Sequence, residues 1–315
     1  MNAPPLTPAR STLQWIEADR RTAMALDQTI IDLYDEYTHK PLARRMFLER
    51  LSLLAGSAGA ASAALAVLEP NYAHAQQVAE ADPRIRIRRI ATTLNGVDQV
   101  GYMAVPAAGG KAPAVIVIHE NRGLNAHIED VVRRFAIAGF AAYGPDMLAP
   151  LGGTPADPDA ARDLFAKLPG EKVVEQAAAA IAMLKADPAT NGRVGAVGFC
   201  WGGGMVNVIA ARLPELGAGV AFYGVAPPAE AAAKIRAPMM LHYAGLDARV
   251  NAGIAGYETA LKAANVPYTL FMYDGVNHAF HNDTSAERYD AKAATLAFDR
   301  SVAFFRQTLG GASPS

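Results

Sequence analysis

Residues 193–204 read RVGAVGFCWGGG, a β-branched run that passes into a glycine-rich stretch. Within it, Gly198-Phe199-Cys200-Trp201-Gly202 has the spacing of the nucleophile elbow G-x-S-x-G, with cysteine in place of serine. The central residue of such an elbow occupies a strained turn, and small residues two positions away let strand and helix approach closely. The turn would place the Cys200 sulfur at a helix N-terminus, where partial positive charge favours the nucleophilic thiolate. The backbone N–H of Trp201 would point the same way, as a candidate oxyanion donor.

Two candidate partners for Cys200 follow it in the chain, each beyond a predicted strand. Residues 239–243 lead into a loop that contains Asp247, and residues 268–273 lead into a loop that contains His278. The order nucleophile, acid, histidine is the order that accompanies this elbow. In the predicted chemistry, His278 accepts the thiol proton, while Asp247 orients the imidazole and stabilises its charged form.

Each of these residues also has an ordinary structural explanation. A lone cysteine is often a buried apolar residue, Asp247 could cap the helix after it, and His278 could be a surface histidine. His242 and His281 compete with His278 as the base, although His242 lies inside an apolar strand and is better explained as a hydrogen-bonded core residue. The presence of all three residues in the required order favours catalysis over these alternatives.

The chain after residue 75 alternates short β-branched runs with longer alanine-rich ones. This alternation predicts one α/β domain over residues 76–315, a mostly parallel sheet of about eight strands with helices on both faces. Asn95-Gly96 predicts an antiparallel hairpin at the sheet edge. Runs such as 115–118 show no polar alternation, as expected for strands covered on both faces. The predicted strands are 85–92, 99–105, 114–119, 141–144, 193–198, 219–223, 238–243 and 268–273, and the predicted helices are 127–137, 157–168, 171–186, 203–212, 252–264 and 286–309.

Composition and charge exclude several classes of protein. The 315 residues include 29 Lys and Arg against 30 Asp and Glu, and 51% are hydrophobic. A collagen-like or wholly disordered chain would not have this apolar fraction. With a net charge of −1 and no zinc-type Cys/His cluster in the sequence, we expect no nucleic-acid partner. The single cysteine cannot form an internal disulfide.

The N-terminal part differs from the rest in composition. Residues 51–68 contain no charged side chain, follow the pair Arg44-Arg45 and precede the small-residue site Ala73-His74-Ala75. This order predicts a removable signal peptide over residues 44–75 that resembles the twin-arginine export signal. A transmembrane helix needs about 20 strongly apolar residues, and this run is shorter and diluted by small residues. A buried alanine-rich helix and an uncleaved anchor are the alternatives.

Export would make the twin-arginine machinery a partner of the chain. The mature residues 76–315 would be periplasmic or secreted, cytoplasmic only before export, and would keep no stable membrane anchor after cleavage. The earlier pair Arg20-Arg21 does not fit such a signal, because acidic residues follow it where an apolar run should be. Residues 1–43 form an extension to which we assign no role. Its apolar residues with helical spacing are Trp15, Ile16, Ile30, Ile31 and Leu33.

Four stretches give residues 76–315 a resemblance to the dienelactone hydrolase family of α/β-hydrolases. They are VIHENRGLN at 117–125, Gly144-Pro145-Asp146, GFCWGG at 198–203 and Asn277-His278-Ala279-Phe280. The resemblance implies the α/β-hydrolase fold and hydrolysis of an ester or enol-lactone through an acyl-enzyme, without a metal or organic cofactor. The site residues it implies are a triad of Cys200, His278 and Asp247, Glu120 near the sulfur, and an oxyanion hole from the N–H groups of Asn121 and Trp201.

Glu120 and Arg122 lie in the first of these stretches. Glu120 ends an apolar strand, so a buried carboxyl there could exchange a proton with the thiol or anchor its loop by accepting backbone N–H bonds. Arg122 could pair with Glu120, bind an anionic substrate or be a solvated surface residue. In well-known members, arginines that hold the substrate carboxylate stand where this chain has Pro150 and Asn282. Since a bidentate guanidinium is hard to replace, this puts the dienelactone itself in doubt as the substrate.

Together these features predict an exported, cofactor-free hydrolase whose Cys200 thiolate attacks an ester or lactone carbonyl. One alternative is a non-catalytic binding protein that has kept the α/β-hydrolase fold, which a missing triad member would favour. The other is a thiol redox protein, which is weakened by the absence of a second, resolving cysteine in the sequence.

Overall fold

The computed structural model describes residues 26–72 and 76–310, and it divides into two compact units, one up to Leu68 and one from Glu69 onward. Trp15, Ile16, the pair Arg20-Arg21 and the site Ala73-His74-Ala75 lie outside the described residues.

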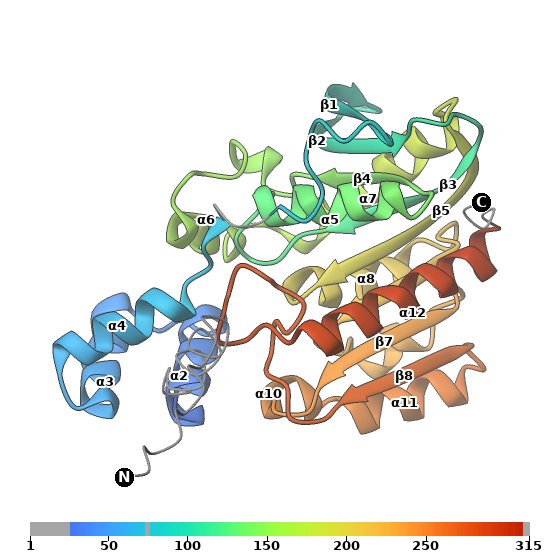
Figure 1. The fold of residues 1–315 in the computed structure, drawn as a ribbon. Helices are drawn as coiled ribbons and strands as arrows, with labels where there is room; N and C mark the ends of the chain where they lie inside the picture. The colour runs from blue at the N-terminus through green and yellow to red at the C-terminus, as the bar shows by residue number, and fades with distance from the viewer. Residues whose placement is uncertain (1–25, 73–75, 311–315) are drawn as a thin grey trace, which may run out of the picture. The chain divides into compact units, whose positions relative to one another are not determined.

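The larger unit is built on one eight-stranded sheet with the order β1-β2-β4-β3-β5-β6-β7-β8 (Figure 1). β2 pairs antiparallel with both β1 and β4, and all the other neighbours are parallel. The predicted α/β-hydrolase fold and its eight strands are therefore confirmed. The strands are β1 (Ile85–Leu94), β2 (Val97–Pro106), β3 (Ala112–Ile118), β4 (Ala141–Pro145), β5 (Thr190–Phe199), β6 (Ala218–Phe222), β7 (Met239–Ala244) and β8 (Tyr268–Tyr273).

The edge hairpin β1–β2 turns at the predicted Asn95-Gly96 pair. Both residues have positive φ angles, 52° and 77°, as a two-residue type I′ turn requires. Leu94 pairs with Val97 directly across the turn, so the register of the two strands is fixed there.

Helices cover both faces of the sheet, as the strand–helix alternation predicts. Buried side chains of α7, α8 and α11 form one hydrophobic cluster with one face of the strands, and those of α5 and α12 form another with the opposite face. The central strands β3, β5 and β6 are buried along their apolar runs. The helices of this unit are α5 (Ala126–Ile137), α6 (Pro158–Phe165), α7 (Gly170–Ala186), α8 (Trp201–Arg212), α9 (Ala229–Ala232), α10 (Ala248–Asn251), α11 (Ile254–Ala263) and α12 (Ala291–Leu309), with a short 3-10 helix η2 (Ala149–Leu151).

The main departures from the predicted helices lie where loops pack. The predicted helix 286–309 starts later, at Ala291, because Asp290 caps it by accepting the amide of Ala293. The residues before this cap form a chain of turns, in which Asn282 accepts the amide of Thr284. The short helices α9 and α10 have too few residues to show a helical hydrophobic period, so the pattern could not predict them.

The smaller unit consists of α2 (Gln28–His39), α3 (Arg44–Ala55) and α4 (Ala58–Leu68). α3 ends at Gly56, which has a φ of 79°, and the direction of the chain bends by 110° between α3 and α4. Phe47 is fully buried and stacks on Tyr37 with ring centroids 4.2 Å apart. The predicted helical pattern of Ile30, Ile31 and Leu33 is confirmed, because these residues form part of the buried face of α2.

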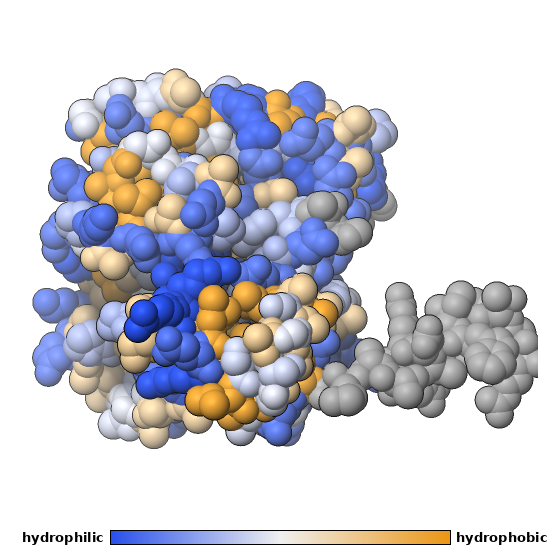
Figure 2. Space-filling view, turned by 90° about the vertical axis from the view of Figure 1, so that its left-hand side faces the viewer, coloured by the Kyte–Doolittle hydropathy of each residue, from blue (hydrophilic) through white to orange (hydrophobic). Residues whose placement is uncertain are grey.

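Several large apolar side chains of α3 and α4 are exposed. Met46, Leu53, Leu54 and Val67 are all exposed, and Figure 2 shows a patch of apolar residues among hydrophilic ones on the face it presents. Within residues 26–72 and 76–310, no single helix has the length and hydropathy for a membrane span. The bent pair α3–α4 meets these criteria only when its two helices are counted together.

Candidate active site

Cys200 sits at the junction of β5 and α8, in the elbow that the sequence predicts. Its backbone has a φ of 55° and a ψ of −115°, a region that non-glycine residues rarely occupy. The amide of Cys200 donates to the Phe222 carbonyl on the neighbouring strand β6, at 3.0 Å. The thiol therefore leaves the sheet at its carboxyl edge, at the N-terminus of a 12-residue helix.

The glycines of the motif are required by close backbone contacts. A Cβ at Gly198 would lie 2.1 Å from the carbonyl oxygen of Gly202, and a Cβ at Gly202 would lie 2.4 Å from that of Ile118. Real side chains do not fit at such distances. The start of α8 thus packs directly against the end of β3, which brings Trp201 and the loop that carries Asn121 to the same edge of the sheet.

Asp247 and His278 meet at this edge from the loops after β7 and β8. Oδ2 of Asp247 lies 2.5 Å from Nδ1 of His278, and both side chains are buried. Oδ1 of Asp247 accepts the amide of Val250 at 3.1 Å, which caps α10. The Asp247 carboxylate therefore makes both contacts considered from the sequence: one oxygen caps a helix and the other contacts His278.

The sulfur of Cys200 lies within 4.8 Å of a ring nitrogen of His278. Since Nδ1 is bonded to Asp247, the nitrogen suited to accept the thiol proton is Nε2. The ring of Tyr223 packs against the imidazole, with centroids 4.8 Å apart. The three residues singled out in the sequence, 47 and 31 positions apart along the chain, are thus neighbours in the fold.

The two competing histidines have other surroundings. His242 is buried in β7, where Nδ1 bonds the Tyr273 hydroxyl at 2.9 Å and Nε2 bonds the Ser301 hydroxyl at 3.1 Å. Burial lowers the pKa of His242 to about 3, so it is neutral at pH 7. His281 stacks on Phe199 with centroids 4.8 Å apart, and burial holds its pKa well below the usual value. The prediction that His242 is a hydrogen-bonded core residue is confirmed.

Glu120 is held by side chains on both of its oxygens. Oε2 accepts Nδ2 of Asn282 at 2.7 Å, and Oε1 lies 3.5 Å from the Tyr223 hydroxyl. Burial and the Glu120 carboxylate raise the pKa of Tyr223 well above its usual value, so the phenol stays protonated and donates. The alternative in which backbone N–H groups hold this carboxylate is wrong, because its partners among the described residues are side chains.

The amide of Asn282 has its orientation fixed by Thr284. Oδ1 of Asn282 accepts both the amide of Thr284 at 3.1 Å and its hydroxyl at 2.6 Å. Nδ2 must therefore face Glu120, and the carboxylate meets a donor. This locked pair joins the loop after β3 to the loop after His278.

Two of the three roles considered for Arg122 from the sequence are wrong. Its Nη1 donates to the Pro158 carbonyl at 2.6 Å and to Oδ1 of Asp159 at 2.8 Å, at the start of α6. The side chain is buried, so a solvated surface arginine is wrong. Pairing with Glu120 is also wrong, because no ion pair joins the two side chains among the described residues. Arg122 ties the loop after β3 to α6.

His119 is a residue of the site region whose contacts the sequence did not reveal. Its Nε2 accepts the amide of Met147 at 3.1 Å, and Nδ1 lies 2.8 Å from the Glu120 carbonyl. Its ring stacks on the indole of Trp201 with centroids 5.7 Å apart, and Phe165 of α6 packs on the same indole at 4.5 Å. Burial lowers the pKa of His119, so it acts as a neutral support beneath Trp201. The one sequence signal for a role of His119 in the site is its position directly after the apolar strand β3.

Comparisons with known proteins show which family and fold this chain resembles. The family model described as "Dienelactone hydrolase family" matches residues 100–309. A "Putative carboxymethylenebutenolidase" of Methylorubrum extorquens is 34% identical over 221 residues, 65% of this chain and 76% of that protein. A "Putative hydrolase fragment YghX" of Escherichia coli is 50% identical over 101 residues, 31% of this chain and 86% of that protein. The crystal structure of a putative dienelactone hydrolase from Klebsiella pneumoniae has a TM-score of 0.66 and 28% identity, covering 71% of this chain and 99% of that one.

A second family model, described as "YqhI-like", matches residues 18–57. The match runs across Arg44 and covers α2 and α3 together. It therefore joins part of the predicted N-terminal extension to the first part of the predicted signal.

Proposed function

The chain belongs to the dienelactone hydrolase family, and on this premise we propose that it cleaves carboxylic esters or lactones through a thioester on Cys200. His278 acts as the base and Asp247 as the group that orients it. The N–H groups of Asn121 and Trp201 stabilise the oxyanion. The reaction needs no cofactor, because the protein side chains supply both the nucleophile and the proton transfers.

The first half of the reaction forms the acyl-enzyme. Nε2 of His278 accepts the Cys200 proton while the sulfur attacks the carbonyl carbon, and the carbonyl oxygen becomes the oxyanion of a tetrahedral intermediate. Asp247 keeps Nδ1 protonated and stabilises the imidazolium that forms. When the intermediate collapses, the C–O bond breaks and His278 donates its proton to the leaving alkoxide or enolate.

The second half returns the free enzyme. His278 accepts a proton from a water molecule, which attacks the thioester carbonyl. Collapse of this second intermediate breaks the C–S bond and releases a carboxylic acid. The sulfur takes back the proton from His278, so the enzyme ends in its starting state.

The observation that carries the proposal is the contact between Asp247 Oδ2 and His278 Nδ1. This contact leaves Nε2, on the other side of the imidazole, to accept the thiol proton. The strained backbone of Cys200 at the start of α8 supports it as well. A carboxylate on Nδ1 together with a thiol within 4.8 Å of the ring is the arrangement that nucleophilic catalysis requires.

We assign Glu120 a positioning role in this site. Its carboxylate, accepting from the locked Asn282 amide and from Tyr223, ties two loops of the site together. Because a neutral amide stands where well-known members carry an arginine, a neutral substrate is favoured over one with a carboxylate. An aryl ester or a simple lactone meets that condition.

The test is a panel of aryl esters and lactones with wild type, Cys200→Ala and His278→Ala. We expect activity to fall by at least about 10³-fold in both variants. Intact-mass measurement after rapid quenching should show the acyl group added to wild type and to no Cys200→Ala molecule. Full activity in either variant would refute the mechanism, and His242→Gln, which alters a histidine of β7, serves as the matched control.

We also propose that residues 44–75 direct export by the twin-arginine route, and that the mature enzyme is periplasmic or secreted. The arginine pair, the uncharged residues 51–68 and the small-residue site support this order of signal elements. Fractionation of cells that express the full chain, with N-terminal sequencing of the product, tests it. Arg44→Lys with Arg45→Lys should keep the enzyme in the cytoplasm, and an unchanged distribution would contradict the proposal.

A further inference from the structure

A cavity lies between α5, α12 and the segment Gln77–Val78. It has a volume of about 240 Å³ and is open to solvent on one side. Cys200, Asp247 and His278 are not among the described residues that line it, so it is distinct from the candidate active site. Its lining includes Val78, Ile137, Ala138, His281, Ala294 and Phe298.

Most of the cavity wall is apolar. Val78, Ile137 and Ala138 form one side, and Ala294 and Phe298 of α12 form another. Apolar cavities of about 150 Å³ in other proteins take up benzene rather than water. A wall of this kind and size suits the ring of a monocyclic aromatic compound.

One polar atom in the wall lacks a partner. His281 is only 1% exposed, and its Nδ1 has no hydrogen-bond partner among the described residues. The ring of His127 lies next to it, with centroids 6.1 Å apart, and Nε2 of His127 has no partner there either. Buried polar atoms of proteins are nearly always bonded, so the ring nitrogen of His281 leaves a hydrogen bond that a ligand in the cavity could make.

The protonation state of His281 indicates which ligand group could bond its ring nitrogen. Burial, together with the nearby Arg134 guanidinium, holds the pKa of His281 well below its usual value, so its imidazole is neutral. A neutral ring nitrogen either donates or accepts one hydrogen bond, depending on the tautomer. A hydroxyl group can meet either need, because it both donates and accepts.

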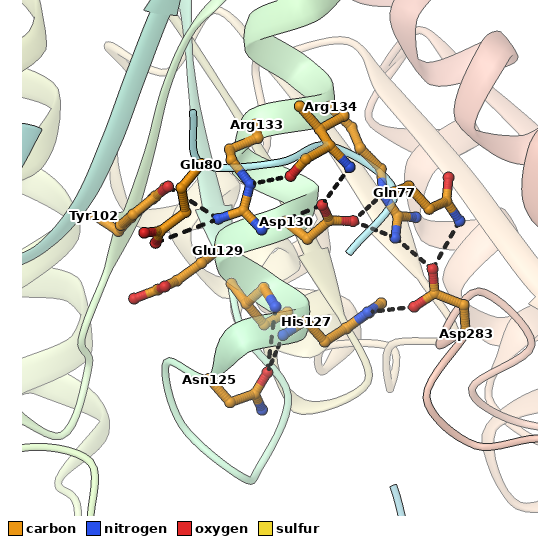
Figure 3. Close-up of polar contacts among 12 residues, drawn as sticks. Gln77, Glu80, Tyr102, Asn125, His127, Glu129, Asp130, Arg133, Arg134 and Asp283 are labelled. Atoms are coloured by element: carbon orange, nitrogen blue, oxygen red, sulfur yellow. Dashed lines mark hydrogen bonds and ion pairs between the residues drawn. The ribbon is translucent and has the colours of Figure 1, made fainter. Parts of the chain in front are cut away.

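The charged side chains beside the cavity already have partners of opposite charge or hydrogen-bonding partners within the protein. Arg134 donates from Nε to Oδ2 of Asp130 at 2.6 Å and from Nη2 to Asp283, which also accepts Gln77 at 2.7 Å and His127 at 2.9 Å (Figure 3). Since this arginine is engaged by two carboxylates, an anionic ligand would gain little from it. The electrostatics therefore favour a neutral ligand.

We infer that this cavity binds a small neutral aromatic compound that carries a hydroxyl group, with its ring on α12 and its hydroxyl on His281. His281 also stacks on Phe199, the residue before Cys200, and follows His278 by three positions. The bound compound would therefore lie directly behind the catalytic loop without entering the site. This inference does not depend on the proposed hydrolytic mechanism.

The test compares two probes by ¹⁹F NMR titration of the full chain, with Cys200 alkylated to block the active site. The probes are 4-fluorophenol and 4-fluorotoluene, which differ in the hydroxyl group. Ala294→Leu fills the cavity from α12, and Ala303→Leu places the same side chain at an exposed position of that helix. His281→Phe keeps a ring against Phe199 but removes both ring nitrogens.

We expect wild type and Ala303→Leu to bind 4-fluorophenol saturably and about tenfold more tightly than 4-fluorotoluene. Ala294→Leu should bind neither probe, and His281→Phe should bind both equally. Equal affinity of the two probes for wild type would overturn hydroxyl recognition. This outcome is measured on wild type alone, so it does not depend on whether a variant folds. Unchanged binding to Ala294→Leu would show that the probes bind elsewhere and would overturn the site.

Discussion

One carboxylate, that of Asp247, serves two partners, because Oδ2 contacts Nδ1 of His278 at 2.5 Å while Oδ1 caps α10 through the amide of Val250. The same residue therefore holds the orientation of the imidazole and the start of the helix beside it. A change at Asp247 can remove one of these contributions or both, which allows them to be measured separately.

Asp247→Asn should separate the two contributions. Asparagine caps a helix about as well as aspartate, so the free energy of unfolding should change by less than about 1 kcal/mol. The lost charge and the altered imidazole tautomer should lower kcat by about 10²- to 10⁴-fold. Asp247→Ala should lose the cap as well, at a cost of about 1 kcal/mol. Steady-state kinetics and urea unfolding of both variants check this, and full activity in Asp247→Asn would contradict the assigned role.

Gly202→Ala should disrupt the elbow. The new methyl group would lie 2.4 Å from the Ile118 carbonyl oxygen and 2.5 Å from that of His119, so α8 must move away from β3. We expect a loss of about 3 kcal/mol or more in the free energy of unfolding, together with loss of activity.

Gly256→Ala is the matched control for this change. Gly256 lies inside α11, and a Cβ there meets nothing within 4 Å. Alanine should therefore stabilise the helix by about 0.5–1 kcal/mol and leave activity unchanged. Equal effects of the two substitutions on urea unfolding would show that backbone contact at Gly202 is not the reason for its glycine.

Asn282→Ala should weaken the site through Glu120. The substitution removes the donor that lies 2.7 Å from Oε2, and the buried carboxylate loses its best partner. We expect kcat to fall by about tenfold, because Glu120 and its loop lose their fixed position. Asn282→Asp places a second carboxylate beside the first and should cost more than alanine. A smaller loss for aspartate than for alanine would argue against this account, and Thr284→Val tests the lock on the amide alone.

The pH dependence of stability should carry a contribution from His242. Its pKa is about 3 in the folded chain, against an ordinary value of 6.5, so below pH 6.5 the unfolded chain binds a proton that the folded chain does not. Stability from this residue is therefore present above pH 6.5 and is lost as the pH falls toward 3. Between pH 7 and pH 5 the loss is about 2 kcal/mol.

His242→Gln checks this by urea unfolding at the two pH values. Glutamine can still bond Tyr273 or Ser301 but does not titrate, so the variant should lose about 2 kcal/mol less than wild type over this interval. Identical losses in the two proteins would exclude His242 as a source of acid sensitivity.

The strands of the sheet could be predicted because their signal is local. A run such as Val115 to Ile118 has no polar residue, and such a run is stable only when helices cover both of its faces. The meeting of Cys200, Asp247 and His278 at one edge of the sheet could be predicted for a related reason. Each residue follows its own strand, and parallel strands end at the same edge.

The partners of the supporting residues could not be predicted in this way. Arg122 meets Asp159, 37 positions away, and Glu120 meets Asn282, 162 positions away. Both contacts depend on how two loops pack after the sheet has formed, and no periodic pattern encodes that. His281 is a rival base by its position in the sequence, but in the fold it lines a cavity and stacks on Phe199, which again depends on loop packing.

The polar contacts of Figure 3 also set the lower limit for a stable catalytic fragment. Val78 donates its amide to Asp130 and accepts Arg133 Nε at 2.6 Å, while Gln77 reaches Asp283. These bonds begin two residues after Ala75, so a chain trimmed to residue 76 keeps every one of them. A chain trimmed to residue 80 would leave the buried Arg133 and Asp130 without these backbone partners. Residues 77 and 78 thus link α5 to the loop that carries both Asp283 and His278.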